Sequence, residues 1–351
     1  MESVKSQFYE VHFGELAQAA LNQQIAKKNY SKIFVLVDTN TKEHCLPLFK
    51  KMIDFNIDSI FEIEPGEENK HILTCLKVWE LLSNLDGDRK SLLINLGGGV
   101  LTDLGGFVAS TFKRGIDFIN IPTTLLSMVD ASVGGKTGVD LGSLKNQIGV
   151  INQPQLVLVF PEFLKTLESR QVISGYAEML KHGLIKDAAY WSSLKLENAF
   201  TDTSTIQKSI AIKNEVVLQD PTEKGLRKIL NFGHTLGHAI ESYCLDNPKK
   251  KTLLHGEAIA VGMIMEGYLS HELTGLPKLS LDEIKTTFLG YFEKVFFDGN
   301  DMDAILELLK YDKKNSHGDI NFVLLRSIGE AVTDVKVPDT LFQKAFAYYL
   351  D

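Results

Sequence analysis

Two histidines stand four residues apart in the segment LNFGHTLGHAIE, which covers residues 230–241. On a helix, residues at this spacing lie on one face, so the rings of His234 and His238 can point into the same cavity. The H-E-x-x-H pattern of zinc proteases is absent, because Thr235 follows the first histidine. The pair therefore fits three interpretations: two metal ligands, one ligand beside a catalytic histidine, or two histidines with a structural role.

Two further segments carry residues that can bind a metal. Glu178 precedes Lys181 by three residues in GYAEMLKHG, a spacing that places both side chains on one helix face. His255 opens the segment HGEAIAVG, at the start of an apolar helix. Three protein ligands and one open position are typical of a catalytic metal. The candidates are Glu178, His234, His238 and His255, and the spacing leaves open which three of them bind.

Glycines and polar residues at strand ends indicate a nucleotide site. In NLGGGVLTDLGGF, residues 95–107, glycines stand where a strand becomes a helix, so the backbone can approach a pyrophosphate at the helix N-terminus. The G-x-G-x-x-G fingerprint is absent, and a plain tight turn is the alternative. Asp38 and Asn40 follow one predicted strand, and Glu67 and Lys70 follow the next. These four residues could hold ribose hydroxyls or simply form turns.

A second glycine-rich segment, VGGKTGVDLGSLKNQIG, covers residues 133–149. It does not match G-x-x-x-x-G-K-[ST], which excludes a P-loop of the Walker type. We predict a loop that brings Lys136, Lys145 and Asn146 onto a phosphate, a role that suits the point charge of lysine.

Composition limits the classes of partner. The 351 residues carry a net charge of −8 at pH 7, which argues against general nucleic-acid binding. The apolar runs have the length of strands, so we expect neither a secretory signal nor a membrane span. Three widely spaced cysteines, Cys45, Cys75 and Cys244, indicate free thiols in a reducing cytoplasm. Several cations fall in or beside the glycine- and histidine-bearing motifs and predict a small anionic ligand: Arg114, Lys136, Lys145, Lys181, Lys213 and Arg227.

The order of the predicted elements indicates an α/β fold. Short β-branched runs alternate with helical patterns in the first half, which predicts a parallel, Rossmann-like sheet with helices on both faces. From about Glu162 this alternation of strands and helices gives way to long segments with helical periodicity. One late strand is predicted in INFVLLRSIGEAV. We expect an N-terminal α/β domain, residues 1–160, and a mostly α-helical C-terminal domain, residues 161–351. The predicted sheet strands lie in KIFVLVDTN, SIFEIEPGEENK, SLLINLGGG, FINIPTTLL and QLVLVF.

Together these segments closely resemble the 3-dehydroquinate synthase family of sugar phosphate cyclases. The matches run in the family's order over most of the chain and include PGEENK, GGGVLTDLGGF, IPTTLLSMVDASVGGKTGV, KNQIG, GYAEMLKHG, LNFGHTLGHAIE, HGEAIAVGM and DKKNSHGDINFVLL. Glycine turns and PTT also occur in iron-dependent alcohol dehydrogenases and glycerol phosphate dehydrogenases. The combination of AEMLK, LNFGHT and HGE is much more specific.

The resemblance implies a lyase of the shikimate pathway, which leads to chorismate and the aromatic amino acids. Such an enzyme converts 3-deoxy-D-arabino-heptulosonate 7-phosphate into 3-dehydroquinate and phosphate with bound NAD and a divalent metal, zinc or cobalt. Oxidation at C5 is followed by phosphate elimination, reduction, ring opening and an intramolecular aldol closure. The family also implies a cytoplasmic homodimer. The N-terminal domain would bind NAD, and the C-terminal domain would bind metal and substrate.

The resemblance also assigns roles to residues. Glu178, His234 and His255 would bind the metal, and His238 would be a nearby base or hydrogen-bonding partner. Lys136 and Asn146 would grip the phosphate with Arg114 of a second subunit, while Asp130 would order the metal site. The substrate carboxylate and hydroxyls would be held by Lys181, Lys213, Arg227 and Asn231, with Lys313 or Lys314 adding charge. The implied NAD contacts are Asp38, Asn40, Glu67, Lys70, Gly98, Gly99, Val100, Asp103, Thr123, Thr124, Lys136, Lys145, Phe163 and Thr166.

Two segments depart from the family's usual pattern. Glu168 in TLESR stands where proline is usual, which affects the expected nucleotide contacts nearby. DNPKKK, between His238 and His255, is expected to be a surface loop of variable length.

Three rival functions remain. Another sugar phosphate cyclase would make a deoxyinosose or valiolone ring, but Lys213, Arg227, Asn231 and His238 together suit a substrate with a carboxylate. A metal-dependent NAD alcohol dehydrogenase would show net redox turnover. A non-catalytic NAD-binding protein is disfavoured by the intact set of motif residues.

Overall fold

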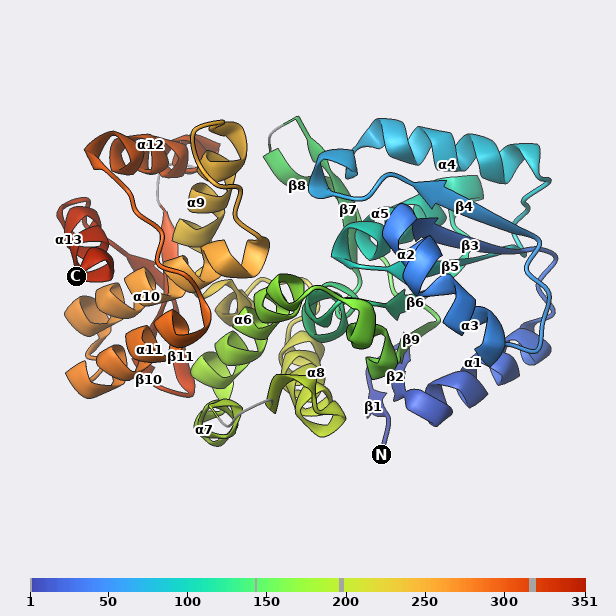
Figure 1. The fold of residues 1–351 in the computed structure, drawn as a ribbon, viewed down its shortest axis with the longest axis horizontal. Coiled ribbons are helices and arrows are strands. Elements are labelled where there is room, and N and C mark those ends of the chain that lie inside the picture. The colour runs from blue at the N-terminus through green and yellow to red at the C-terminus, as the bar shows by residue number, and fades with distance from the viewer. Residues whose placement is uncertain (1, 143, 196–198, 316–319) are drawn as a thin grey trace. The chain divides into compact units, whose positions relative to one another are not determined.

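The computed structural model describes residues 2–142, 144–195, 199–315 and 320–351 (Figure 1). The chain forms two compact units, residues 1–172 and 173–351. The change from one unit to the next falls in the first turn of helix α6 (Ser169–Lys186). The division into an NAD-binding part to residue 160 and a metal- and substrate-binding part after it stays a prediction.

Unit 1 is built on a largely parallel sheet with the strand order β1-β2-β9-β6-β5-β3-β4. Only β1 and β2 pair antiparallel in this sheet, among the residues described. Strand β3 is buried along almost its whole length, as expected for parallel strands covered on both faces. The five strands predicted for the sheet are confirmed, whereas the short β1 and β2 were missed. The strands are β1 (Val4–Lys5), β2 (Glu10–Phe13), β3 (Ile33–Asp38), β4 (Ser59–Ile63), β5 (Leu92–Gly97), β6 (Asp117–Pro122) and β9 (Leu156–Val159).

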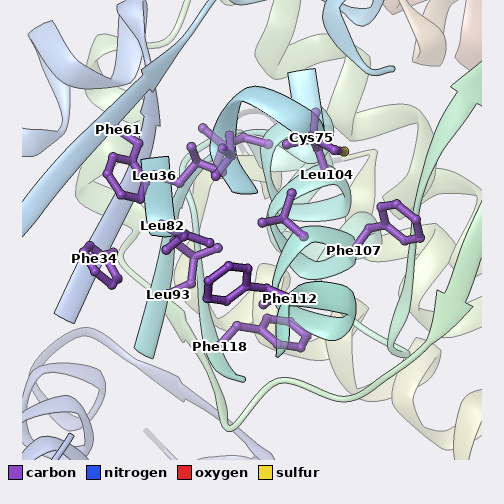
Figure 2. Packing of buried hydrophobic residues seen from close by; sticks show 14 of the residues in the cluster. Phe34, Leu36, Phe61, Cys75, Leu82, Leu93, Leu104, Phe107, Phe112 and Phe118 are labelled. Atoms are coloured by element: carbon purple, nitrogen blue, oxygen red, sulfur yellow. The ribbon is translucent and has the colours of Figure 1, made fainter. Parts of the chain in front are cut away.

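Helices cover both faces of this sheet, with α4 on one side and α1 on the other (Figure 1). Phe34 and Leu36 of β3 pack with Leu82 of α4 and Leu104 of α5 in a continuous apolar core (Figure 2). Val35 points to the opposite face and is also fully buried, which confirms the predicted α/β layers. The helices are α1 (Gly14–Lys28), α2 (Thr39–His44), α3 (Leu46–Met52), α4 (Ile72–Asn84) and α5 (Gly99–Thr111), with the short turns η1 (Glu67–Asn69), η2 (Phe112–Arg114), η3 (Ser127–Ala131) and η4 (Pro161–Thr166).

The strand order contains a topological switch point. From β3 the chain continues to β4 on one side and then returns to β5 on the other side of β3. Ligands of open parallel sheets bind outside the carboxyl ends of strands at such a point. Asp38, the last residue of β3, and Gly98, the first residue after β5, therefore stand where a nucleotide is expected.

The glycine-rich segment 133–149 is a hairpin and not the predicted loop. Its strands β7 (Lys136–Leu141) and β8 (Leu144–Ile151) pair antiparallel, with Gly138 opposite Gly149. A Cβ on Gly149 would lie 2.3 Å from the carbonyl oxygen of Thr137, so only glycine permits this close approach of the strands. A segment rich in glycine and small turn residues predicts a loop, whereas here the glycines permit two strand backbones to lie close together.

Unit 2 is mostly helical, as predicted. The one late strand that was predicted is a two-stranded hairpin, β10 (Asn321–Ser327) and β11 (Glu330–Lys336). Within the described ranges, none of the helices has the length and apolar character that a bilayer crossing requires. The helices after α6 are α7 (Ala188–Leu194), α8 (Thr203–Gln219), α9 (His234–Asp246), α10 (His255–Thr274), α11 (Lys278–Tyr291), α12 (Gly299–Asn315) and α13 (Thr340–Leu350), with the turns η5 (Ala199–Thr201) and η6 (Leu226–Asn231).

Glycines let the backbones of α9 and α10 touch. A Cβ on Gly262 of α10 would lie 2.0 Å from the carbonyl oxygen of Gly233 and 2.8 Å from the nitrogen of Gly237. A Cβ on Gly237 would in turn lie 3.0 Å from Cα of Ile259. Because backbone atoms cannot move aside as a flexible side chain can, these glycines fix how closely the two helices pack.

Gly262→Ala should therefore destabilise the protein by about 3 kcal/mol or more, since it overpacks a contact between two backbones. Gly290→Ala is the matched control, because Gly290 lies in α11 and a Cβ there would meet no atom within 4 Å. The control should be neutral or stabilise by up to about 1 kcal/mol through helix propensity. Denaturant unfolding of both variants measures the difference, and equal midpoints would contradict the packing argument.

Candidate active site

In unit 2 two imidazoles at the beginnings of helices α9 and α10 approach a carboxylate in the middle of helix α6. Nε2 of His234, the first residue of α9, lies 3.6 Å from Oε1 of Glu178. Nε2 of His255, the first residue of α10, lies 3.5 Å from the same oxygen. Metal–ligand bonds of about 2 Å could join all three atoms to one cation after small side-chain adjustments.

Glu178 is fully buried in α6 and forms an ion pair with Lys181, one turn further along the helix. Among the described residues, neither oxygen of this carboxylate has a hydrogen bond of normal geometry. Burial raises the pKa of Glu178, but Lys181, His234 and His255 outweigh it and hold the pKa well below its usual range. Buried charges are paired or coordinate metals, and here Lys181 pairs with Oε2 while two imidazole nitrogens face Oε1, so Oε1 and these nitrogens could together hold a cation.

The second ring nitrogen of each histidine is held by an acceptor. Nδ1 of His234 lies 3.1 Å from the carbonyl oxygen of Phe232, and Nδ1 of His255 lies 3.3 Å from Oε2 of Glu241. Donation by Nδ1–H directs the Nε2 lone pair of each ring toward a metal once Nε2 carries no proton. Sequence reasoning missed Glu241, although it follows His234 by seven residues and thus shares a helix face with it.

The pKa values of the two imidazoles are shifted in opposite directions. Burial lowers the pKa of His234 well below its ordinary value, and the charge of Lys181 adds to this effect. Burial also lowers the pKa of His255, but the carboxylates of Glu241 and Glu178 outweigh it and raise the pKa to about 10.

His238 lies one turn after His234 and completes the histidine cluster. Its ring centroid is 5.1 Å from that of His234 and 5.7 Å from that of His255. Nitrogens of these three rings all lie within 4.8 Å of one another, so the trio could also hold an ion. His238 is exposed, however, whereas His234 and His255 face the buried Glu178.

Three of the cations predicted to bind the substrate are buried in unit 2. They are Lys181, Lys213 on α8 and Arg227 on η6. Their contact with a substrate stays a prediction. The Arg227 guanidinium donates from Nη1 to the carbonyl oxygen of Pro221 over 2.9 Å. The predicted Lys313 and Lys314 fall at the end of α12, where the side chains lie outside the described residues.

The loop before η6 is shaped by two acidic residues. Asp220 accepts hydrogen bonds from the backbone nitrogens of Lys224, Gly225 and Arg227, which lower its pKa. Glu223 has a φ of 58° and accepts a 2.8 Å hydrogen bond from Nδ2 of Asn231. Sequence reasoning missed Glu223. Its left-handed backbone, uncommon outside glycine, and its contact with a predicted substrate residue make it a further candidate.

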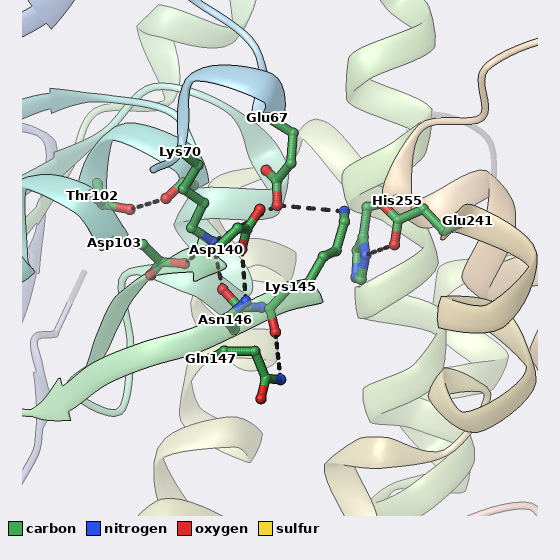
Figure 3. A network of polar contacts seen from close by, with 11 residues as sticks. Glu67, Lys70, Thr102, Asp103, Asp140, Lys145, Asn146, Gln147, Glu241 and His255 are labelled. Atoms are coloured by element: carbon green, nitrogen blue, oxygen red, sulfur yellow. Dashed lines mark hydrogen bonds and ion pairs between the residues drawn. The ribbon is translucent and has the colours of Figure 1, made fainter. Parts of the chain in front are cut away.

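In unit 1, Lys70 contacts several residues that are predicted to bind NAD or phosphate, and so holds these residues together (Figure 3). Its ammonium nitrogen lies 2.7 Å from Oδ2 of Asp103 and 2.7 Å from Oδ1 of Asn146. Lys145 in turn pairs with Glu67 over 3.4 Å. Burial lowers the pKa of Lys70, but the charges of Asp103 and Glu67 outweigh it and raise the pKa above its ordinary value.

Two predicted nucleotide segments meet at the switch point. Asp38 caps α2 by accepting from the nitrogen of Thr41 over 2.7 Å, and Asn40 is exposed beside it. Helix α5 begins at Gly99 with no side-chain cap among the described residues, so its first N–H groups can meet a phosphate. A Cβ on Gly98 would lie 3.1 Å from Cγ2 of Thr124, which places Thr124 beside the glycine turn.

The remaining predicted residues are dispersed over unit 1. Val100 continues α5, and Thr123 donates its backbone N–H to Gly97 over 3.0 Å. Phe163 is buried in η4, and the Thr166 hydroxyl donates to its carbonyl oxygen. The others lie in these elements: Asp130 in η3, Lys136 at the start of β7, and Arg114 at the end of η2 with a φ of 72°.

Arg114 lines a cavity of about 390 Å³ with residues 115–118 and the end of β8. Glu168, in the position where proline is usual, accepts the first backbone hydrogen bonds of α6 through its carbonyl oxygen. This contact requires only a carbonyl, so glutamate supports the start of the helix there.

Solved structures with this fold include sugar phosphate cyclases. A 2-deoxy-scyllo-inosose synthase complexed with carbaglucose-6-phosphate, NAD+ and Co2+ matches with a TM-score of 0.84 and 25% identity over 98% of this chain and 99% of that one. A 2-epi-5-epi-valiolone synthase from Streptomyces hygroscopicus, with NAD+ and Zn2+ bound, matches with a TM-score of 0.83 and 26% identity over 100% and 99%.

Sequence comparison separates this chain from those cyclases. The 3-dehydroquinate synthase N-terminal family model matches residues 60–174, and the C-terminal one matches residues 175–315. A 3-dehydroquinate synthase from Parabacteroides distasonis is 44% identical over 334 residues, 92% of this chain and 94% of the relative. One from Campylobacter jejuni subsp. doylei is 39% identical over 339 residues, 94% and 93%. The chain therefore belongs to the 3-dehydroquinate synthase family.

Proposed function

We propose that this protein is a 3-dehydroquinate synthase, a lyase that converts 3-deoxy-D-arabino-heptulosonate 7-phosphate into 3-dehydroquinate and phosphate. The observation that carries the proposal is the approach of two imidazole nitrogens to one buried carboxylate oxygen in a chain of this family. Identities of 39–44% with dehydroquinate synthases, against 25–26% with the inosose and valiolone synthases, favour this substrate over the rival sugars.

The same comparison argues against a simple alcohol dehydrogenase. An NADH-dependent butanol dehydrogenase from Thermotoga maritima shares the fold at a TM-score of 0.65, but only 11% of the residues are identical. A fold alone does not define a reaction, so the chemistry depends on the side chains.

Glu178, His234 and His255 would hold a divalent metal, and zinc is the ion that we propose. An oxygen and two imidazole nitrogens suit zinc or cobalt and leave a position for substrate. When bound, the metal supplies a Lewis acid and NAD supplies a reversible hydride acceptor. His238 is exposed beside the metal ligands, so its ring can exchange protons between substrate and solvent.

The buried cations would bind and orient the substrate. Lys181, Lys213 and Arg227, together with Asn231, would hold the carboxylate and ring hydroxyls. Fixed charges that need no reorganisation are commonly worth a few kcal/mol each when charge develops. Lys136 and Asn146 would grip the phosphate with Arg114 of the partner subunit, and Asp130 would help to order the metal site.

The NAD contacts would be those carried over from the family. The pyrophosphate would meet the uncapped start of α5 at Gly98, Gly99 and Val100, and the residues after β3 and β4 would meet the ribose. The cellular setting that we propose is a cytoplasmic homodimer that makes an aromatic amino acid precursor.

The purified protein should release phosphate from the heptulosonate phosphate without net formation of NADH. The reaction should require NAD and stop when a chelator removes the metal, because hydride acceptor and Lewis acid are both needed. Colorimetric phosphate release across a panel of sugar phosphates measures this. Release from glucose 6-phosphate, with none from the heptulosonate phosphate, would favour the inosose-forming rival instead.

His255→Ala should lose both metal and activity, because it removes a proposed ligand. His238→Ala should keep the metal and lose rate, by about 10²-fold or more if it is a proton-transfer group. Metal content by mass spectrometry, measured with phosphate release, separates the two outcomes. His44→Ala, at an exposed position on α2, is the control and should retain both. Full metal occupancy in His255→Ala would disprove the ligand assignment.

Lys70→Met should weaken NAD binding and destabilise the protein by about 3 kcal/mol, because it leaves the Asp103 carboxylate without its buried partner. Lys42→Met removes an exposed lysine at 2.5 Å from Glu62 and should change little. Calorimetric NAD titration and denaturant unfolding compare the variants. Equal NAD affinity in both would show that Lys70 does not organise the nucleotide site.

A further inference from the structure

Glu266 is a fully buried carboxylic acid that the reaction described above does not use. It lies in the middle of α10, where nearly every neighbouring residue is small or apolar. Burial raises its pKa to about 8, although the backbone N–H groups of Leu236, Gly233 and Thr235 lower it. Burying a carboxyl group costs free energy unless its oxygens are well hydrogen-bonded, so its contacts indicate its role.

Both oxygens of Glu266 accept hydrogen bonds from the beginning of α9. The nitrogen of Gly233 donates to Oε2 over 2.6 Å, and the nitrogen of Leu236 donates to Oε1 over 3.1 Å. The first N–H groups of a helix have no partner within the helix and need an acceptor from elsewhere. Glu266 therefore caps α9 from a different helix.

Helix α9 cannot cap itself. Its N-cap residue is Gly233, at a φ of 80°, so the usual side-chain oxygen is missing. A Cβ at this position would lie 2.2 Å from Cγ of Met263 and 3.1 Å from the nitrogen of Met263. The close packing of α9 on α10 thus excludes a serine or aspartate cap, and the acceptor comes from α10 itself.

The two bonds bracket the proposed metal ligand His234. Gly233 is the residue before it, and Leu236 is the second residue after it. The imidazole has one further anchor, the contact of Nδ1 with the carbonyl oxygen of Phe232. With the backbone fixed on both sides and Nδ1 held, Nε2 is left to face Oε1 of Glu178.

We infer that Glu266 is a positioning residue that holds the first turn of α9, and through it the His234 imidazole, in the orientation needed to bind the metal. The inference rests on the proposed ligand set. Groups that orient a metal ligand typically contribute 10- to 100-fold to metal affinity.

Glu266→Gln tests this with little change of shape. The amide has one oxygen in place of two, so one backbone N–H of α9 loses its acceptor. Ser270→Ala is the matched control, because Ser270 lies one turn further along α10 and its hydroxyl accepts from the buried nitrogen of Leu325 over 2.9 Å. The same hydroxyl donates to the backbone carbonyl oxygen of Glu266 over 2.6 Å, so this variant also tests whether a lost contact at the Glu266 backbone is enough to weaken metal binding. Both variants remove a side-chain acceptor on α10 from a buried backbone N–H, which belongs to Leu325 of β10 in the control and to the start of α9 in Glu266→Gln.

Metal-free protein is titrated with Co2+, with the visible absorption spectrum as readout, and the unfolding midpoint is measured in parallel. Both variants should lose stability, whereas only Glu266→Gln should weaken Co2+ binding, about tenfold, and alter the Co2+ spectrum. Equal Co2+ affinity in the two variants would reduce Glu266 to a purely structural residue. If Glu266→Gln is insoluble, Glu266→Asp retracts the carboxylate by one methylene and permits the same comparison.

Two further measurements keep the outcomes distinct. If the cap formed by Glu266 favours metal binding, metal binding must favour the cap by the same free energy. Co2+ should therefore slow hydrogen exchange of the Gly233 and Leu236 amides in the wild-type protein. Unchanged exchange at these amides would also overturn the inference. His255→Ala separates this result from the ligand assignment, because normal Co2+ binding by that variant refutes the ligand set, whereas normal binding by Glu266→Gln alone refutes only the role of Glu266.

Discussion

The fully buried carboxylate of Glu178 is the constraint on which unit 2 depends. It is stable as an anion only because Lys181 and two imidazoles approach it, and its oxygens have no hydrogen bond of normal geometry among the described residues. Such a group would be costly in an ordinary core. Helices α6, α9 and α10 can be understood as the supports that bring one carboxylate and two ring nitrogens to a common point.

Helix beginnings, and not loops, carry the two histidines. His234 and His255 are the first residues of α9 and α10, so a small change in either helix would move a ring nitrogen. Glycine contacts between the helices allow their backbones to touch, and Glu266 caps the helix whose N-cap has no side chain. Packing and hydrogen bonding therefore serve the same end, which is a rigid orientation of side chains before any ligand arrives.

Unit 1 contains the predicted nucleotide site, and a buried charge also orders the residues there. The switch point between β3 and β5 is a property of the sheet, and the same fold occurs in cyclases and dehydrogenases alike. In this chain the side chains placed there include the buried Lys70, which lies between Asp103 and Asn146. One lysine orders residues from three separate elements, because a buried cation requires several acceptors. In both units a buried charge therefore holds residues of the candidate site together.

The sequence by itself determined the central strands and the residue types of the site, because buried parallel strands are continuous apolar runs and the motifs lie within short segments. It also indicated the family, which the comparisons confirm. It did not determine that residues 136–151 pair as a hairpin, or that Glu223, Glu241 and Glu266 meet Asn231, His255 and the start of α9. Those contacts join residues separated along the chain. Only the packing of one helix or strand against another decides which acceptor reaches which donor.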